Sequence, residues 1–201
     1  MGEGWGEGLC LRPPRSPGAR VNQVIVISGP PGAGKSSTAA ALIERFDRML
    51  IVEVEELRHM VKAGFRQPWA GDQQAREQLE LAVRNACALA RESIAMRYSV
   101  AIVDVVLPWQ AALYRERLAS LAPAAPSHLV TLLPSLEVAL QRDAPRGADS
   151  IPDRVRVVHR EITAERGTLP GAILDTSHDA NAAATADRVQ DVVSRGLARR
   201  T

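Results

Sequence analysis

The residues with the clearest chemistry form the segment Gly29-Pro30-Pro31-Gly32-Ala33-Gly34-Lys35-Ser36, followed by Ser37. It fits the phosphate-binding pattern G-x-x-x-x-G-K-[ST], in which glycines let backbone N–H groups turn toward phosphate oxygens without a Cβ in the way. The lysine reaches the β- and γ-phosphates, and the serine after it offers a hydroxyl to Mg²⁺. A chance match occurs in about one chain in a hundred at the usual glycine frequency, so the pattern alone leaves a plain glycine-rich turn open.

The elements around this segment favour the phosphate-binding interpretation. The apolar, β-branched run 24–27 precedes it and is typical of a strand buried on both faces of a parallel sheet. The stretch 36–46 follows it and predicts an amphipathic helix whose positive end points at bound phosphates. We therefore expect a nucleotide phosphate site between this strand and this helix.

Strand-like and helix-like segments alternate along the rest of the chain. Further strands are expected at 49–54, 99–106, 128–133 and 172–174. Further helices are expected from 57 to 61 and over 73–97, 108–122, 135–143, 153–166 and 181–199, with loops at 63–72 and 144–152. This alternation predicts an α/β fold with a parallel sheet.

Composition limits the classes of function. The chain has 201 residues, 46% of them hydrophobic and 24% charged, which suits one globular domain of residues 21–201. A net charge of +2 gives no basic field for a polyanion and argues against a nucleic-acid partner. Two cysteines and no apolar run long enough to cross a membrane predict a cytoplasmic protein. Residues 1–20, rich in glycine and proline, are expected to form a flexible N-terminal extension.

Asp104 is a candidate metal ligand beside Ser36. It lies near the carboxyl end of the strand expected at 99–106, where the active groups of parallel sheets collect. In such proteins a strand-end aspartate holds Mg²⁺ directly or through water, although it can also simply cap the next turn. The next residue is Val105 rather than a carboxylate, and no Asn-Lys-x-Asp tetrapeptide occurs, which argues against motor-type ATPases and GTPase switches.

Three other segments extend the pattern: Glu53-Val54-Glu55-Glu56-Leu57-Arg58, the stretch 136–146, and Ala172-Ile173-Leu174-Asp175-Thr176-Ser177. Together with the phosphate-binding loop they make the chain resemble, over about residues 22–198, the small P-loop kinases of metabolites and antibiotics. These include chloramphenicol phosphotransferase, shikimate kinase, gluconate kinase and the zeta-toxin group. The resemblance implies a three-layer P-loop NTPase fold, with a five-stranded parallel sheet in the order 2-3-1-4-5, helices on both faces and a small lid.

The resemblance also implies an activity. It implies transfer of the γ-phosphoryl of ATP, held with Mg²⁺, to a hydroxyl of a small-molecule acceptor. The segment 53–58 stands where these kinases have an Asp-x-Asp-x-x-Arg-like run. Within it, Val54-Glu55-Glu56-Leu57 also resembles the Val-Asp-x-Leu segment that supplies the catalytic carboxylate of the antibiotic kinase. By that match Glu55 would accept the acceptor's proton or orient its hydroxyl. Glu53 would then lie nearer the metal and phosphates, and Arg58 would bind an anionic or polar acceptor. Glutamate replaces the usual aspartate, so which carboxylate acts on the acceptor stays open, and a solvated acidic strand end is the alternative.

Arg142 and Arg146 resemble the arginines at the start of the kinase lid, here expected over about 144–152. A mobile loop carrying arginines can close over ATP, exclude water and neutralise the transferred phosphoryl group. Without a lid, the same spacing of four residues is an ordinary polar helix face. Asp175 follows the last expected strand, where these kinases have the turn beside the nucleobase, but it can equally cap the final helix.

Trp69 and Trp109 are candidates to line the acceptor site. Each falls just beyond a strand on the expected active face, in a chain with only 3% aromatic residues. Core packing beneath a loop is the alternative for each. The acceptor and the oligomeric state stay open, and so do two other functions: a nucleotide-binding regulatory protein with little turnover and a nucleic-acid end kinase, which the low net charge disfavours.

Overall fold

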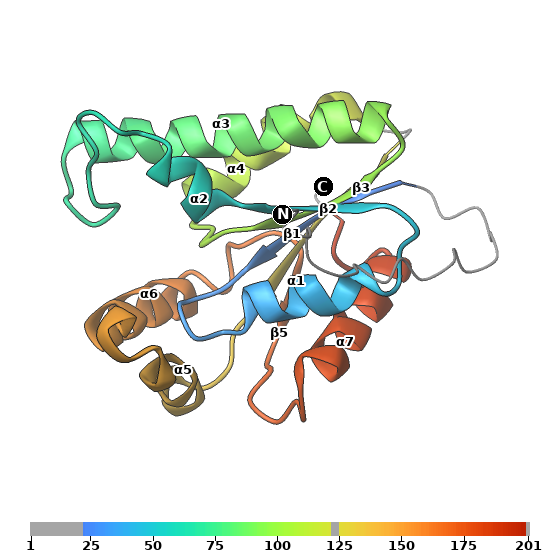
Figure 1. Ribbon diagram of the computed structural model, residues 1–201. Coiled ribbons are helices and arrows are strands. Elements are labelled where there is room, and N and C mark those ends of the chain that lie inside the picture. Colours follow the sequence, from blue (N-terminus) through green and yellow to red (C-terminus); the bar gives the residue numbers. More distant parts are fainter. Residues whose placement is uncertain (1–21, 122–124, 200–201) are drawn as a thin grey trace, which may run out of the picture.

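Among the described residues, five parallel strands form one sheet at the centre of the structure (Figure 1). The structure, a computed structural model, describes residues 22–121 and 125–199; the flexible extension predicted at 1–20 lies outside them. The strand order is β2-β3-β1-β4-β5 and every neighbouring pair is parallel, so the predicted fold class and order are confirmed. In chain order the elements are β1 (Val24–Ser28), α1 (Lys35–Ile43), β2 (Met49–Glu53), α2 (Val54–His59), α3 (Gln73–Ala95), β3 (Ser99–Val103), α4 (Pro108–Leu118), the 3₁₀ turn Ala119–Leu121, β4 (Ser127–Leu132), α5 (Leu136–Asp143), the 3₁₀ segment Ala144–Asp149, α6 (Pro152–Ala164), β5 (Ala172–Leu174) and α7 (Ala182–Ser194).

Strand β1 lies at the centre of the sheet and contributes to two hydrophobic cores. All its residues are buried, and their side chains alternate between the two faces of the sheet. Val24 and Val26 pack on the face covered by α3 and α4, whereas Ile25 and Ile27 pack on the face covered by α1 and α7 (Figure 1). A strand buried on both faces needs a continuous apolar sequence, which explains why the run 24–27 does not alternate.

Helix α6 forms a third, smaller cluster. Val158 and Ile162 pack with Leu169, and Leu133 and Ile173, from β4's end and from β5, border them. Helix α5 packs on α6. The 3₁₀ segment between these two helices is therefore carried by elements anchored on the β4–β5 side of the sheet (Figure 1).

The acidic segment at the end of β2 becomes helical earlier than the sequence predicted. Helix α2 begins at Val54 rather than at 57, with Glu53 as its extended N-cap residue. Glu55 and Glu56 occupy the first turn, where the helix dipole stabilises negative charge, and Arg58 lies in the last turn, where it stabilises positive charge. Glu53 therefore ends a strand while Glu55 stands on a helix, so the two carboxylates are presented differently.

Helix α3 is long, amphipathic and close to the sheet. Its buried face carries small residues such as Ala82, Ala86 and Ala90, which permit close packing. Its first turn is capped by Asp72, whose carboxylate accepts a hydrogen bond from the Ala75 N–H at 2.8 Å. No helix in the described ranges has both the length and the apolar character needed to cross a membrane.

The closing helix is shorter than predicted. Helix α7 ends at Ser194, and the residues beyond it turn back against β4. There the Leu129 N–H donates to the Ala198 carbonyl at 2.9 Å, and His128 forms an antiparallel bridge with Arg199. Pairing with β4 replaces the last helical turn, which the apolar pattern of the sequence could not reveal.

Candidate active site

The phosphate-binding loop, residues 29–36, connects β1 to α1 at the carboxyl edge of the sheet. Gly29 has φ of 146° and Gly32 has φ of 78°, conformations that favour glycine. A Cβ on Gly29 would overlap the carbonyl oxygen of Leu132, and a Cβ on Gly32 would overlap that of Ala139. The loop is thus enclosed by the backbone of β4 and α5, and neither position accepts a larger residue.

Lys35 is the first residue of α1, and its side chain turns back over the loop. Its ammonium group donates to the carbonyl oxygens of Gly29 at 2.9 Å and of Pro30 at 3.1 Å. Helix α1 begins at the same residue, so its positive end and the lysine charge are presented together. This is the arrangement that anion binding at a helix N-terminus requires.

Glu53 lies against the loop from the end of β2. The Ser36 hydroxyl and the Lys35 ammonium group both lie near its carboxylate and favour its ionised form. Burial raises the pKa of Glu53, and the Ser36 hydrogen bond and the Lys35 charge oppose that rise. Of the two glutamates expected near the acceptor, Glu53 is thus the one that the structure brings to the phosphate-binding loop.

Asp104 directly follows β3 and is held by three donors from the segment after it. The Val105 N–H donates to one carboxylate oxygen at 2.7 Å, and the Tyr114 hydroxyl donates to the other at 2.9 Å. The Gln110 amide reaches that second oxygen at 3.5 Å. Burial raises the pKa of Asp104 to about 6, against the opposing effects of these hydrogen bonds and of Lys35 and Arg58. Sequence reasoning missed Tyr114 and Gln110, although their spacing of four on a helix right after Asp104 is a usable signal.

The residues at this edge fit a hydrated Mg²⁺ ion. Ser36, Glu53 and Asp104 supply hydroxyl and carboxylate oxygens, the ligand type that Mg²⁺ prefers. The pKa values of both carboxylates are raised by burial, and a nearby cation would stabilise their ionised forms. Within the described residues, no group of three or more His, Cys, Asp or Glu side chains is arranged to hold a metal ion. The donor set is therefore of the kind that binds Mg²⁺ together with water and substrate phosphates.

Arg58 joins α2 to the same edge. Burial lowers the pKa of its guanidinium, and the negative charges of Glu55 and Asp104 oppose that shift. The guanidinium carbon also lies 5.9 Å from the centre of the Phe65 ring. The charge of Arg58 thus interacts with those of two carboxylates, of which Glu55 is exposed at the start of α2.

The loop between α2 and α3, residues 60–72, is held by side chains of α3. Gln78 is buried; its amide donates to the Gly64 carbonyl at 2.7 Å, and its oxygen accepts from the Arg66 N–H at 2.8 Å. Gln74 donates to the same Gly64 carbonyl at 3.0 Å and accepts from the Arg66 side chain at 3.1 Å. These contacts order a loop that the sequence describes only as polar and glycine-containing.

Trp69 lies in this loop and contacts α6. Its side chain is 47% exposed, and the Arg154 guanidinium carbon lies 5.1 Å from its ring centre. Arg154 stands in the first turn of α6, directly after the expected lid. The contact therefore joins the α2–α3 loop to the α5–α6 region across the carboxyl edge of the sheet.

Trp109 has different surroundings. The Arg76 guanidinium carbon lies 3.6 Å from its ring centre, so one face of the indole is already covered. Both residues line a groove of about 490 Å³ between α3 and α4, with Leu113 and Arg115 among its other walls. The structure thus gives the two tryptophans separate partners on separate helices, although the sequence predicted a common acceptor site for them.

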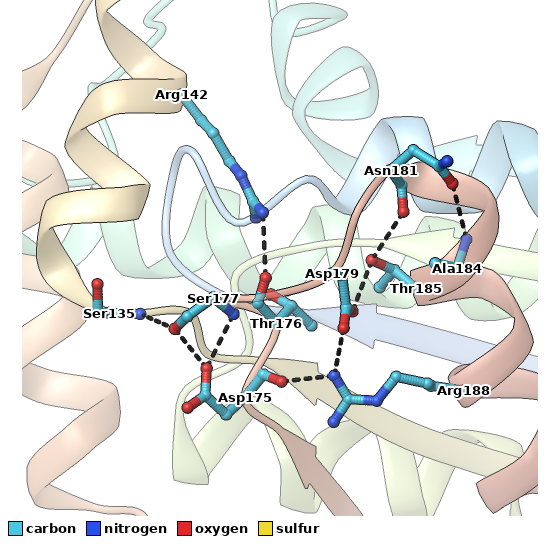
Figure 2. A network of polar contacts seen from close by, with 10 residues as sticks. All are labelled: Ser135, Arg142, Asp175, Thr176, Ser177, Asp179, Asn181, Ala184, Thr185 and Arg188. Atoms are coloured by element: carbon cyan, nitrogen blue, oxygen red, sulfur yellow. Dashed lines mark hydrogen bonds and ion pairs between the residues drawn. The ribbon is translucent and has the colours of Figure 1, made fainter.

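The turn after β5 is tied to α5 and to the loop after β4 (Figure 2). Arg142 points from α5 to the Thr176 carbonyl, to which it donates at 3.0 Å. The Asp175 carboxylate accepts from both the N–H and the hydroxyl of Ser177, and these bonds lower the pKa of Asp175. The Ser177 hydroxyl in turn accepts from the Ser135 N–H at 2.8 Å. Arg142 on α5 is therefore hydrogen-bonded to the turn that Asp175 closes.

The same turn is fixed to α7. Arg188 donates to the Asp175 carbonyl and to the Asp179 carboxylate, both at 2.6 Å. Asp179 also accepts from the Thr185 hydroxyl at 2.8 Å (Figure 2). The α7 N-cap is Asn181, not Asp175, because the Asn181 side chain accepts from the Ala184 N–H at 3.0 Å. The capping alternative for Asp175 is therefore wrong.

The expected lid is more regular than a loop. Residues Ala144–Asp149 form a 3₁₀ segment, kinked at Gly147. The buried Asp143 carboxylate closes this segment by accepting from the Ser150 hydroxyl and the Ile151 N–H, both at 2.8 Å. Arg146 lies within the segment, but its side chain is outside the described part of the chain. The polar loop predicted at 144–152 thus contains a 3₁₀ segment over Ala144–Asp149, and Asp143 supplies the local hydrogen bonds that order it.

Comparison with known proteins identifies the family. A family model described as AAA domain matches residues 24–171. The chain belongs to this family. No match was found among curated proteins. The predicted resemblance to small P-loop kinases is confirmed by the solved structures that resemble this AAA-domain protein.

Several kinases and a resistance protein share the fold. The tunicamycin resistance protein of Deinococcus radiodurans is 22% identical, with a TM-score of 0.59, over 90% of this chain and 99% of that chain. A gluconokinase from Sinorhizobium meliloti is 21% identical, with a TM-score of 0.58, over 89% and 95%. Shikimate kinase from Acinetobacter baumannii, solved in complex with shikimate, is 19% identical, with a TM-score of 0.55, over 88% and 93%. At these identities the likeness establishes a P-loop kinase-like fold for this family member.

Proposed function

We propose that the protein transfers the γ-phosphoryl group of ATP to a hydroxyl of a small-molecule acceptor. The observation that carries the proposal is the convergence of Lys35, Ser36 and Glu53 at the phosphate-binding loop. Asp104 lies close enough to Lys35 for their charges to interact. We place this activity in one kinase domain, residues 21–201, with a lid at about 144–152, and in the cytoplasm.

On the nucleotide side, the residues bind and orient the triphosphate. The loop N–H groups and Lys35 hold the β- and γ-phosphates, with the helix dipole of α1 behind them. Ser36 and Asp104 would hold Mg²⁺, with Glu53 beside Ser36. Bound there, the ion would supply positive charge to neutralise the phosphates.

On the acceptor side, Glu55 orients the reacting hydroxyl. The acceptor oxygen bonds to the γ-phosphorus as the bond to the β–γ bridging oxygen breaks, and ADP leaves. The hydroxyl proton passes to the Glu55 carboxylate. Arg58 interacts with the charges of both Glu55 and Asp104 and so links that carboxylate electrostatically to the edge of the sheet. Trp69 offers an exposed ring face, which suits an acceptor with an apolar or ring-like surface.

The lid side supplies positive charge and covers the nucleotide. Asp175 lies in the turn after β5 and Arg142 binds that turn from α5, and we assign this turn to the nucleobase side. We assign Arg146, in the 3₁₀ segment, to the transferred phosphoryl group. Closure of this segment would exclude water, which otherwise competes with the acceptor.

The decisive variant is Lys35→Ala, with Lys62→Ala as its control. Lys62 is exposed and is the one other lysine of the chain. Phosphoryl transfer to a panel of hydroxyl acceptors, followed by phosphorus NMR with ATP and Mg²⁺, should be abolished by the first change and kept by the second. Unchanged transfer in Lys35→Ala would overturn the proposal. ATP binding without acceptor-dependent ADP release across a broad panel would instead favour a nucleotide-binding regulatory protein.

A further inference from the structure

Tyr114 is a core residue with one polar atom at the candidate active site. Its ring is fully buried among the side chains that α3 and α4 pack against the sheet. Its hydroxyl donates to Asp104 at 2.9 Å, across ten residues of sequence. A phenylalanine would fill nearly the same volume, so packing alone does not require the hydroxyl.

The hydroxyl completes a set of donors that fixes the Asp104 carboxylate. One carboxylate oxygen accepts from the Val105 N–H at 2.7 Å, and the other accepts from Tyr114 and, at 3.5 Å, from Gln110. Gln110 is itself held, because its oxygen accepts from the Leu107 N–H at 3.1 Å. Both oxygens are therefore oriented by groups behind the site, before any nucleotide or metal arrives.

We propose that Tyr114 is a positioning residue that holds the Asp104 carboxylate in the orientation needed at the metal side of the nucleotide site. This inference rests on the proposed function, because it assigns Tyr114 a task in Mg²⁺-dependent nucleotide binding. A hydrogen bond to a charged group is among the stronger ones in proteins, and a buried tyrosine hydroxyl keeps little freedom to move. Tyr114 itself touches neither nucleotide nor acceptor and acts through Asp104.

A double-mutant cycle with Tyr114→Phe and Asp104→Asn tests this assignment. The measured quantity is the Kd of the non-hydrolysable ATP analogue AMPPNP, with Mg²⁺ and with EDTA. Tyr114→Phe should weaken binding about fivefold to tenfold with Mg²⁺ and leave it unchanged in EDTA. Asp104→Asn should weaken Mg²⁺-dependent binding by a larger factor, and adding Tyr114→Phe to it should have no further effect.

Tyr98→Phe is the matched control, because Tyr98 is the other tyrosine of the chain and is 39% exposed. It should leave both Kd values unchanged, and thermal unfolding should verify that every variant is folded. Equal losses with Mg²⁺ and in EDTA, or an undiminished effect of Tyr114→Phe in the Asp104→Asn background, would assign Tyr114 a structural role only. If the unaltered protein bound no AMPPNP at all, the proposed function would fall, and this inference with it.

Discussion

The nucleotide side and the acceptor side of the candidate site are built in different ways. On the nucleotide side, backbone atoms pack against each other, because Gly32 lies directly against the Ala139 carbonyl of α5. On the acceptor side, long side chains make the contacts: Gln78 holds the α2–α3 loop, and Arg154 covers Trp69. Backbone contacts of this kind tolerate almost no change of residue, whereas side-chain contacts can be replaced one at a time. We therefore expect substitutions on the acceptor side to be tolerated better than substitutions on the nucleotide side.

The largest difference should come from adding one methyl group to a glycine on each side. Gly32→Ala should abolish nucleotide binding and cost about 3 kcal/mol of stability, because the new Cβ overlaps a backbone oxygen at a positive φ. Gly71→Ala, in the α2–α3 loop, should cost only about 1 kcal/mol, since nothing lies within 4 Å of its Cβ and only the φ of 74° is strained. Urea unfolding and AMPPNP binding measure both effects. Similar losses in the two variants would remove the contrast between the sides.

The two glutamates should separate binding from turnover. Glu55→Gln should lower turnover by about 10²-fold to 10³-fold and leave ATP affinity unchanged, because it removes a proton acceptor on the exposed start of α2. Glu53→Gln should weaken Mg²⁺-dependent ATP binding, since Glu53 lies beside Ser36 at the loop. Steady-state kinetics and calorimetry with ATP would distinguish them. Equal losses of turnover and affinity in Glu55→Gln would argue against its acceptor-side role.

The nucleotide side should also carry a pH-dependent cost in stability. The pKa of Asp104, about 6, lies above its ordinary value of 3.8, so the folded protein binds this proton more tightly than the unfolded chain does. The contribution of Asp104 to stability is therefore greatest below about pH 4 and falls as the pH rises to about 6. Its loss should be about 2 kcal/mol, at about 1.4 kcal/mol per pKa unit with allowance for partial solvent access.

The difference between Asp104→Asn and the unaltered protein isolates this contribution. Urea unfolding of both, measured at several values between pH 4 and pH 7 without nucleotide, should show the unaltered protein losing stability relative to the variant as the pH rises. Parallel curves for the two proteins would show that Asp104 titrates normally. Other carboxylates titrate in the same range, which is why the comparison with the variant is needed.

The sequence predicted more of the nucleotide side than of the acceptor side, and the structure shows why. The phosphate-binding loop depends on glycines whose spacing is local, so eight consecutive residues predict it. The strand order agreed with the expectation because the order follows from a family fold rather than from single residues. The position of Glu53 beside Ser36 depends on the pairing of β2 with β3, two strands that lie far apart in sequence. Local patterns do not carry such information.

The acceptor side depends on contacts that no local pattern specifies. Gln78 is buried although glutamine is usually exposed, because it hydrogen-bonds two backbone groups of the α2–α3 loop. Trp109 is covered by Arg76, which stands 33 residues earlier in the chain and so lies outside the reach of periodicity arguments. Asp143 orders the segment expected to be a loop. Gln78 and Asp143 thus each order a neighbouring segment through a single polar side chain.

The smallest expected effect concerns the contact between Arg154 of α6 and Trp69 of the α2–α3 loop. Arg154→Ala should weaken the docking of the α2–α3 loop on α6 by about 0.5–1 kcal/mol, the usual value of an exposed cation–π contact. Arg156→Ala is the matched control, because Arg156 pairs with Asp153 on the exposed side of the same turn. In a Trp5→Phe, Trp109→Phe background, Trp69 is the one tryptophan left in the chain. There, acrylamide quenching of tryptophan fluorescence should rise for Arg154→Ala and stay constant for Arg156→Ala. Equal quenching in both variants would show that Arg154 does not shield Trp69.

The two carbonyl bonds of Lys35 have a consequence for how a phosphate group is received. A free lysine side chain loses about 2 kcal/mol of rotamer entropy when it is ordered. Here the Gly29 and Pro30 carbonyls order it during folding. When a triphosphate binds, the Lys35 ammonium group can donate to phosphate oxygens in place of these two carbonyl oxygens without first having to be ordered. The rotamer entropy of Lys35 is therefore lost when the protein folds and not when the triphosphate binds. The heat of binding should then be dominated by the exchange of hydrogen-bond partners.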